Sequence, residues 1–214
     1  LLDTLGIQHP IFLAPMAGVS TPELAAQVSN QGAFGSLGLG ASIVDAARKQ
    51  ILHTQELTDK PFQVNFFCHE SRDLNSEVSQ NWIALFAEKF KELDAEAPTS
   101  LNCIYPSFKD NDDFLNLVLE TKPKAVSFHF GIPHVHQIKA LKNAGIITLV
   151  SATNLAEAKA IEAAGIDIII AQGIEAGGHR GIFNESFDAA IRTEDLVQLI
   201  KQNCTLPVIA AGGI

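Results

Sequence analysis

The sequence predicts a parallel α/β barrel of the eight-stranded TIM type that lacks its last strand and C-terminal part. Two observations lead to this fold class. Short apolar runs alternate with amphipathic helical stretches, and a unit of helix, Ala-Gly and apolar strand recurs at Asn143–Ile147 and Ala163–Asp167. Such repetition implies parallel strands joined by right-handed crossovers. Because the strands follow one another without a dinucleotide fingerprint, a closed barrel is favoured over an open doubly wound sheet.

The predicted strands are short and almost continuous in apolar residues. This composition is typical of strands whose two faces are both covered by helices. An eighth strand would lie beyond Ile214. The predicted strands are Ile11–Pro15, Ala33–Leu37, Phe62–Phe67, Ala125–His129, Ile146–Val150, Asp167–Ala171 and Pro207–Ala211.

Three helices between these strands have clear start signals. The helix predicted over Thr21–Gln31 begins with hydroxyl residues and has Pro22 at an early position, where proline is tolerated. The helix over Asn154–Ala164 begins with an Asn cap and stops at Gly165. The helix over Thr193–Lys201 begins with a hydroxyl followed by two acidic residues, which favour a helix N-terminus.

The region Ser71–Lys122 is less regular than the rest of the chain. It contains a predicted helix around Asn81–Leu93, a stretch over Pro98–Pro106 and a second helix around Asp113–Thr121. No sign of a separate domain is present. We therefore expect residues 1–214 to form one barrel domain, with an excursion over the barrel mouth at about 71–122.

Length and composition agree with a large folded domain. The chain has 214 residues, of which 47% are hydrophobic and 18% are charged, as in soluble globular proteins. Barrels of this type typically have ~250 residues. Because the chain begins at Leu1 and stops just after a predicted strand, we expect it to be part of a longer protein.

Charge and cysteine content indicate which kinds of partner and which cellular compartment to expect. The net charge is −9 and no basic run is present, so nucleic acid is not expected as a partner. Cys68, Cys103 and Cys204 are far apart and form no CxxC pair, which favours a reduced, cytoplasmic protein over a disulfide framework or a zinc site. No apolar stretch approaches the ~20 residues that cross a bilayer, so no membrane partner is expected.

The active site of such a barrel lies at the C-terminal ends of its strands. Polar residues and glycines gather there, whereas the strand interiors are aliphatic. Asn65 lies at the end of one predicted strand, His129 ends the next, and Gln172–Gly181 and Gly212-Gly213 follow two later ones. This distribution predicts a site where a ligand approaches the backbone closely.

Two glycine-rich stretches carry the strongest signals. Gly212-Gly213 allows backbone N–H groups to approach a phosphate, as barrels often do after strands seven and eight, or it forms a tight turn. Gln172–Gly181 contains Gly177 and Gly178, which would let main chain lie against a flat ligand, and His179, which titrates near neutral pH. The alternative for this stretch is a flexible loop with incidental charges.

Other candidates remain open on chemistry alone. His129 is either structural or functional, Met16 either packs on an aromatic ring system or belongs to the core, and Tyr105 either reaches over the mouth or lies on the surface. His134 and His136 resemble a metal pair. On a helix, residues two apart point to different faces, and no carboxylate stands at ligand spacing, so no metal is expected.

The motifs along the chain resemble those of nitronate monooxygenases, formerly called 2-nitropropane dioxygenases. Ala14–Ala26, which includes Pro-Met-Ala-Gly-Val-Ser-Thr-Pro, is similar to their first motif. Phe128–Gly131 with Leu141–Gly145 resembles the second, Ala171–Gly181 the third, and Pro207–Ile214 the start of the phosphate-binding strand. The resemblance covers essentially the whole chain, in order, and is closest to the bacterial class I enzymes.

The resemblance implies a barrel that binds FMN without a covalent link. It also implies oxidation of alkyl nitronates, including propionate 3-nitronate, by molecular oxygen through a flavin semiquinone, giving a carbonyl compound and nitrite. Residues matching positions at the flavin or its phosphate, with Gly212 added from the phosphate argument above, are Met16, Asn65, Gln172, Gly177, Gly178, Gly212 and Gly213.

The resemblance also implies roles around the substrate. His179 matches the His usually proposed as the catalytic base, and His129 and Tyr105 match positions that line the substrate pocket. An anionic nitronate needs a partly cationic pocket, which His179, His129 or Arg180 could supply. A protonated His179 would favour the anion, and a neutral one could deprotonate a nitroalkane.

Two other functions remain as alternatives. The first is an FMN-dependent, NAD(P)H-using reductase of the same superfamily, an enoyl-acyl carrier protein reductase or a quinone reductase, since Glu175–His179 is shared with these enzymes. The segment Pro15–Pro22 favours the monooxygenase. The second is a sugar-phosphate lyase or isomerase barrel, in which Gly212-Gly213 would bind substrate phosphate. The predicted strand ends offer no Lys for such chemistry.

Overall fold

The computed structural model describes residues 1–72, 74–110 and 112–214. Asp73 and Asn111 fall within the expected excursion and lie outside the described residues. The chain divides into two compact units, one formed by Leu1–Glu70 with Pro106–Ile214 and the other by Ser71–Tyr105. The second half of the expected excursion, including the helix over Asp113–Thr121, therefore belongs to the first unit.

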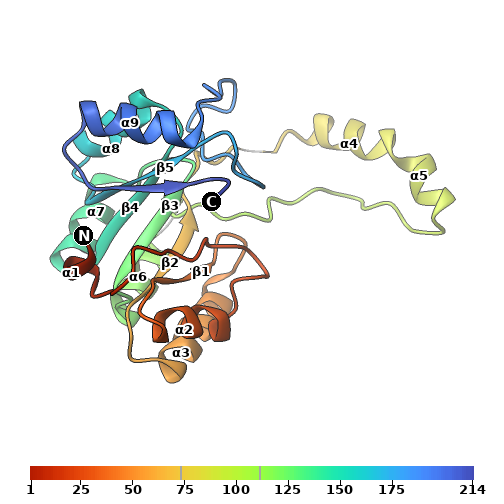
Figure 1. Ribbon diagram of the computed structural model, residues 1–214. Coiled ribbons are helices and arrows are strands. Elements are labelled where there is room, and N and C mark those ends of the chain that lie inside the picture. The colour runs from red at the N-terminus through yellow and green to blue at the C-terminus, as the bar shows by residue number, and fades with distance from the viewer. Residues whose placement is uncertain (73, 111) are drawn as a thin grey trace. The chain divides into compact units, whose positions relative to one another are not determined.

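The first unit is built on one parallel sheet, which curves as part of a barrel (Figure 1). Its strands pair in sequence order, each with the next, as the repeated strand and helix units predict. Residues 62–67 and 125–129 form strands with the predicted bounds. The strands are β1 (Gly35–Gly38), β2 (Phe62–Phe67), β3 (Ala125–His129), β4 (Ile147–Ala152), β5 (Ile168–Gln172) and β6 (Val208–Ala211).

The first predicted strand, Ile11–Pro15, is wrong as a regular strand. Only Phe12 forms an isolated parallel bridge, to Phe34, and the N–H of Leu13 donates to the carbonyl of Phe34. Pro10 and Pro15 lack the N–H groups that a strand needs. The segment therefore runs beside β1 and pairs only around Phe12.

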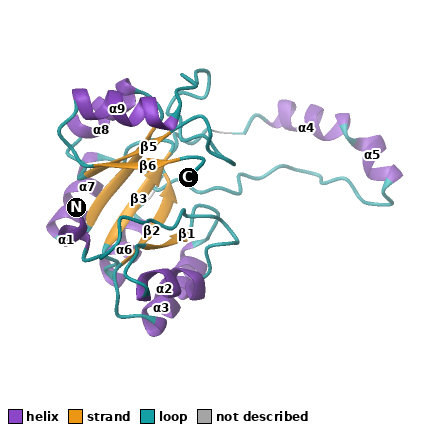
Figure 2. Cartoon of the chain, viewed as in Figure 1, coloured by secondary structure: helices purple, strands orange, loops and turns teal. Residues whose placement is uncertain are grey.

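Helices cover the outer face of the sheet, as Figure 2 shows for the purple layer around the orange strands. Of the predicted start signals, Thr21 accepts a hydrogen bond from the N–H of Leu24 at 3.2 Å, and the Asn154 side chain accepts one from Glu157 at 3.0 Å. These caps begin α2 and α8 as expected. The helices of this unit are α1 (Leu2–Leu5), α2 (Pro22–Asn30), α3 (Val44–Leu57), α6 (Asp113–Thr121), α7 (Val135–Asn143), α8 (Leu155–Ala163) and α9 (Thr193–Asn203).

The inner face of the sheet changes character along the strands. Near their N-terminal ends, Phe34, Ala125, Leu149 and Ile168 form a buried apolar cluster with Leu5 of α1. Because side chains alternate across a strand, residues two and four positions further along β3 lie on this same inner face. Those residues are polar, and they belong to the candidate site described below.

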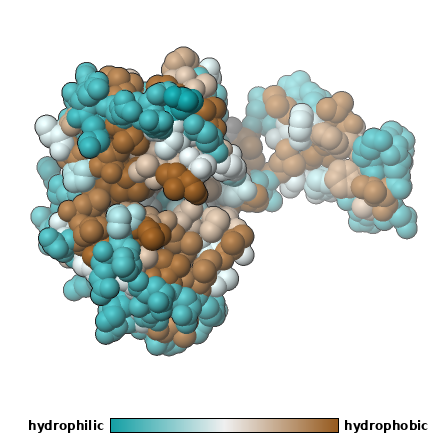
Figure 3. All heavy atoms as spheres, viewed as in Figure 1, coloured by the Kyte–Doolittle hydropathy of each residue, from teal (hydrophilic) through white to brown (hydrophobic). Residues whose placement is uncertain are grey.

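One face of the first unit exposes apolar surface. Figure 3 shows it as brown between the teal surfaces of α8 and α9 and those of α2 and α3. Ile11 and Val19, beside the β1 side of the sheet, are among the exposed apolar residues, and Ile214 is another. Within the described ranges, no helix is both long enough and apolar enough to cross a membrane.

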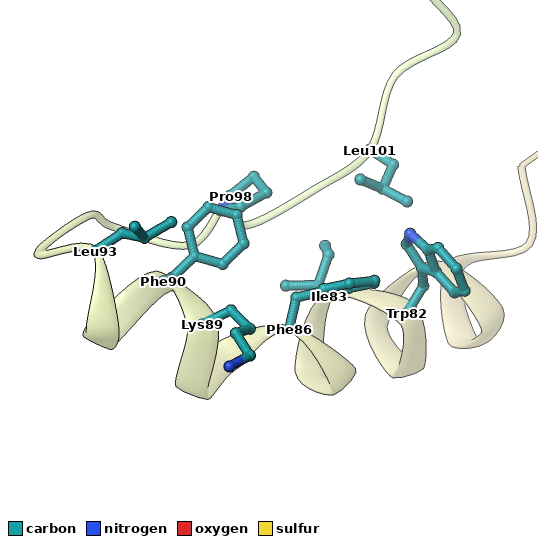
Figure 4. A pocket seen from close by; sticks show the side chains of 8 residues that line it. All are labelled: Trp82, Ile83, Phe86, Lys89, Phe90, Leu93, Pro98 and Leu101. Atoms are coloured by element: carbon teal, nitrogen blue, oxygen red, sulfur yellow. The ribbon is translucent and has the colours of Figure 1, made fainter.

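The second unit contains two short helices, α4 (Ser76–Leu85) and α5 (Ala87–Glu92). They divide the single helix predicted around Asn81–Leu93, with Phe86 between them. An apolar groove lies between these helices and the chain that follows them (Figure 4). Its lining residues are Trp82, Ile83, Phe86, Lys89, Phe90, Leu93, Pro98 and Leu101.

Candidate active site

Polar side chains occupy the C-terminal ends of neighbouring strands in the first unit. Asn65 of β2 lies in register with Ser127 of β3. The buried Asn65 amide donates to the Ser127 hydroxyl at 3.0 Å and to its carbonyl at 3.2 Å. His129 lies two residues after Ser127 on β3 and faces the same side of the sheet. The register of the sheet thus brings together polar groups that are far apart in the sequence.

His129 is held between a strand and a loop. Its Nδ1 lies 3.0 Å from the Ser151 hydroxyl of β4, and its Nε2 lies 3.3 Å from the main-chain carbonyl oxygen of His179. Desolvation lowers the pKa of His129 to about 4, and the charges of His179 and Arg180 act in the same direction. At neutral pH the imidazole of His129 is therefore uncharged.

Gln172, the last residue of β5, anchors the loop that follows it. Its side-chain amide nitrogen donates to the His179 carbonyl at 3.1 Å, and its amide oxygen accepts from the Gly181 N–H at 2.7 Å. A Cβ on Gly181 would lie 2.6 Å from Cε1 of His129. Gly181 is therefore required for the close approach of this loop to the His129 ring.

Arg180 does not act as a free cation. Its guanidinium makes a bidentate pair with Asp188, at 2.9 and 3.1 Å, and donates to the carbonyl oxygens of Gln172 and Gly173. The hydrogen bond from Arg180 holds the pKa of Asp188 below its ordinary range. Arg180 thus stabilises the loop, and its charge is balanced by Asp188.

His179 lies against an aromatic cluster at the end of β2 and β3. Its ring centroid lies 6.1 Å from that of Phe67 and 5.7 Å from that of Phe130. Phe130 has a φ of 72°, a left-handed conformation that is strained for a bulky residue. Such strain is concentrated at functional sites. His179 and His129 are thus brought into one site, as the sequence predicts for strand ends.

The glycines of the β5 loop leave open space. A Cβ added at Gly177 or Gly178 would meet nothing within 4 Å, and Gly178 has a φ of 76°. Met16 is 37% exposed, and its main chain lies so close to the end of β1 that a Cβ on Gly38 would be 2.9 Å from its carbonyl carbon. Both features provide surface for a ligand at the C-terminal side of the strands.

Gly212 and Gly213 follow β6 with left-handed φ values of 105° and 71°. They lie against Ala176 and Glu175 of the β5 loop. At the start of α9, the Thr193 N–H donates to the Glu175 carboxylate at 2.9 Å, and the Thr193 hydroxyl lies 2.8 Å from that carboxylate and 2.9 Å from the carbonyl of Gly212. The two glycine-bearing loops therefore meet at the N-terminus of α9, where the Glu175 carboxylate is the bound anion.

Three further residues considered in the sequence are Tyr105, His134 and His136. Tyr105 is the last residue of the second unit and is 36% exposed, so it is described only within that unit. The rings of His134 and His136 stack 5.8 Å apart, and His136 pairs with Asp112. Across the described ranges, no group of three or more His, Cys, Asp or Glu side chains is arranged to hold a metal ion.

Several residues of the site were missed by the sequence reasoning. They are Phe67, Ser127, Phe130, Ser151 and Asp188, which contact the predicted residues directly. Alternation along β3 would have indicated Ser127, which is two positions before His129 and faces the same side. No local signal indicates that Phe130 is left-handed or that Asp188 pairs with Arg180.

The chain is similar to known proteins over its whole length. A family model described as nitronate monooxygenase matches residues 1–214. The chain is 54% identical to a nitronate monooxygenase from Paraburkholderia phytofirmans over 215 residues, covering 100% of this chain and 59% of the relative. It thus spans about 60% of the length of the curated relatives that it matches.

Solved structures are similar to the chain in fold. A nitroalkane oxidase from Streptomyces ansochromogenes matches with a TM-score of 0.88 and 36% identity, over 100% of this chain and 60% of that one. FabK from Thermotoga maritima matches with a TM-score of 0.72 and 32% identity, over 99% and 53%. The half-barrel of six strands agrees with the TIM-type barrel predicted from the sequence. The chain belongs to the nitronate monooxygenase family.

Proposed function

We propose that the protein containing this chain oxidises alkyl nitronates, such as propionate 3-nitronate, with molecular oxygen and FMN, and releases a carbonyl compound and nitrite. The observation that carries the proposal is the placement of His179 at the C-terminal ends of the strands. There it lies beside Phe67 and Phe130, while its main chain is fixed by His129 and Gln172. Family membership supports the same reaction class.

The residues present fit FMN. Gly177 leaves room where a Cβ would find no neighbour, as a flat ring system needs, and Gly212 and Gly213 adopt conformations that side chains rarely allow. The phosphate would be held by main-chain N–H groups of Gly212 and Gly213. Residues proposed to contact the flavin are Met16, Asn65, Gln172, Gly177 and Gly178. When bound, FMN supplies the electron transfer from nitronate to oxygen.

The charges of the site favour His179 as the group that meets the substrate. His129 is uncharged, because burial lowers its pKa to about 4, and Arg180 is neutralised by Asp188. His179, which lies beside Phe67 and Phe130 at the strand ends, is therefore the candidate that we assign to the substrate. When protonated it stabilises an anionic nitronate, and when neutral it accepts the α-proton of a nitroalkane.

The test is an assay of the purified protein with propionate 3-nitronate in air, in which nitrite release and oxygen uptake are both measured. We expect both, without any need for NADPH. The competing function is the NAD(P)H-using reductase, with which the Glu175–His179 stretch is also compatible. Consumption of NADPH with an enoyl thioester or a quinone, and no nitrite from the nitronate, would favour that reductase.

A further inference from the structure

One main-chain atom of the site receives two side-chain hydrogen bonds. The carbonyl oxygen of His179 lies 3.3 Å from Nε2 of His129, which belongs to β3, and 3.1 Å from the amide nitrogen of Gln172, which belongs to β5. The loop that carries His179 is therefore tied to two different strands at the same point. Such double anchoring restricts the loop more than either bond alone.

The partners of His129 determine its tautomer. A carbonyl oxygen can only accept, so Nε2 must carry the proton that is donated to His179. Nδ1 then presents a lone pair, and the Ser151 hydroxyl donates to it at 3.0 Å. Burial and the charges of His179 and Arg180, the titratable groups that act on this ring, lower the pKa of His129 to about 4, which keeps this neutral tautomer across the physiological range.

The packing of the loop gives independent support. Gly181 lies directly against the His129 ring, with room for a hydrogen but not for a methyl group. The Gly181 N–H is held at the same time by the Gln172 amide oxygen at 2.7 Å. Both ends of the segment His179–Gly181 are thus fixed, by His129 and Gln172 together.

We infer that His129 is a positioning residue, which uses its neutral Nε2–H tautomer with Gln172 to fix the main chain of the loop carrying His179. In this role His129 does not bind the charge of the substrate. The kinetic part of this inference rests on the proposed nitronate oxidation, whereas its structural part does not. Misplacement of a catalytic group by about 1 Å can lower turnover by ~100-fold, so such positioning has a large effect.

The test compares two variants of His129 with a control in the full chain. His129→Leu removes the donor, and His129→Gln restores an N–H near the position of Nε2. His53→Gln is the control, because His53 is an exposed histidine of α3 whose two ring nitrogens pair with the exposed carboxylates of Glu23 and Glu56. Hydrogen exchange of the segment 177–183, flavin content, kcat and KM are measured for each.

We expect His129→Leu to exchange faster at residues 177–183, to keep its flavin, and to lose roughly 10- to 100-fold in kcat. KM should change little, and the pH profile of kcat should keep the same limbs. His129→Gln should recover most of the loss, and His53→Gln should match the parent. A raised KM with unchanged kcat, or a lost limb of the pH profile, would assign His129 to the substrate and overturn the inference.

A second measurement decides the inference if the Leu variant does not fold or if the parent does not oxidise nitronates. Nitrogen-15 NMR of the imidazoles in the parent protein reports the protonation of each ring nitrogen. We expect His129 to show a protonated Nε2 and an unprotonated Nδ1 from pH 5.5 to 8. A doubly protonated ring at pH 6, or the opposite tautomer, would overturn the inference whatever the reaction of the enzyme.

Discussion

The two ends of the sheet in the first unit differ more than any two of its strands. At the N-terminal end of the inner face, Phe34, Leu149 and Ile168 pack into an apolar cluster. At the C-terminal end, four residues after Ala125 on β3, His129 makes hydrogen bonds to Ser151 and a loop. The same strands thus build a stabilising core at one end and a chemical site at the other, which is the division expected for barrels.

The boundary between the two ends lies at Ser36 of β1 and Gln63 of β2, which are paired in register. Both are buried, and the Ser36 hydroxyl and the Gln63 amide oxygen find no hydrogen-bond partner in the described part of the chain. Just beyond them, Asn65 is bonded to Ser127. Along the strands, the first polar side chains of the inner face therefore include atoms without a hydrogen-bond partner among the described residues, and the bonded side chains follow nearer the C-terminal ends.

Replacing His179 should impair the C-terminal site and leave the apolar cluster intact. His179→Asn keeps a polar side chain but cannot titrate near neutral pH. We expect turnover of propionate 3-nitronate to fall by roughly 10²- to 10⁴-fold, with flavin content and Tm unchanged. Steady-state kinetics and the visible spectrum measure this. Kinetics equal to those of the parent would remove His179 from its proposed role.

A substitution in the apolar cluster should lower stability without changing turnover. Leu149 is fully buried in the apolar cluster, and Leu149→Ala should lower the free energy of unfolding by about 2–5 kcal/mol. The matched control is Leu52→Ala on α3, where the side chain is 44% exposed and the loss should be under ~1 kcal/mol. Urea unfolding measures both. A fall in kcat per folded molecule of Leu149→Ala would contradict the division between the ends.

A third effect links the chemical end to stability through pH. The folded-state pKa of His129 is lowered from about 6.5 to about 4, so unfolding takes up a proton between these values. Its contribution is therefore complete above pH 6.5 and is lost as pH falls toward 4, by up to about 3 kcal/mol. Urea unfolding at several pH values should give a shallower slope for His129→Gln. Identical slopes would mean that His129 is not held neutral.

A smaller effect is expected on FMN affinity when Gly177, at the proposed flavin surface, is replaced by alanine. A Cβ at Gly177 meets nothing within 4 Å, so Gly177→Ala should leave the protein without flavin as stable as the parent, or more stable by ~0.4–1 kcal/mol. If the flavin ring packs on Gly177, the variant should bind FMN several-fold more weakly. Titration followed by flavin fluorescence measures this. Equal affinities would place the ring elsewhere.

The fold was predictable from the sequence where a strand buries an apolar face against helices. Phe62–Phe67 and Ala125–His129 have the bounds predicted for them, and the alternate residues Val64 and Phe128 pack in the core cluster. Ile11–Pro15 is more apolar than either strand, yet it forms only a bridge. Composition reports burial, whereas strand pairing also depends on neighbours and on backbone N–H groups that proline lacks.

The candidate site was predictable in its location and only partly in its contacts. Strand ends and glycines indicated His129, Gln172 and His179, because parallel strands bring their C-terminal ends to one edge. The atom that joins these three residues is a main-chain carbonyl, and no side-chain pattern in a sequence indicates which carbonyl accepts. The roles of Met16, Tyr105 and the glycines toward FMN and substrate stay predictions.

Nitronate oxidation by a flavin is tested most directly by a visible spectrum of the whole protein, followed by anaerobic mixing with propionate 3-nitronate and, separately, with NADPH. We expect a yellow protein with a flavin spectrum that changes on mixing with the nitronate and does not change with NADPH. A flavin that responds only to NADPH would contradict nitronate oxidation. A spectrum without flavin would contradict the assignment of the C-terminal end of the sheet to FMN.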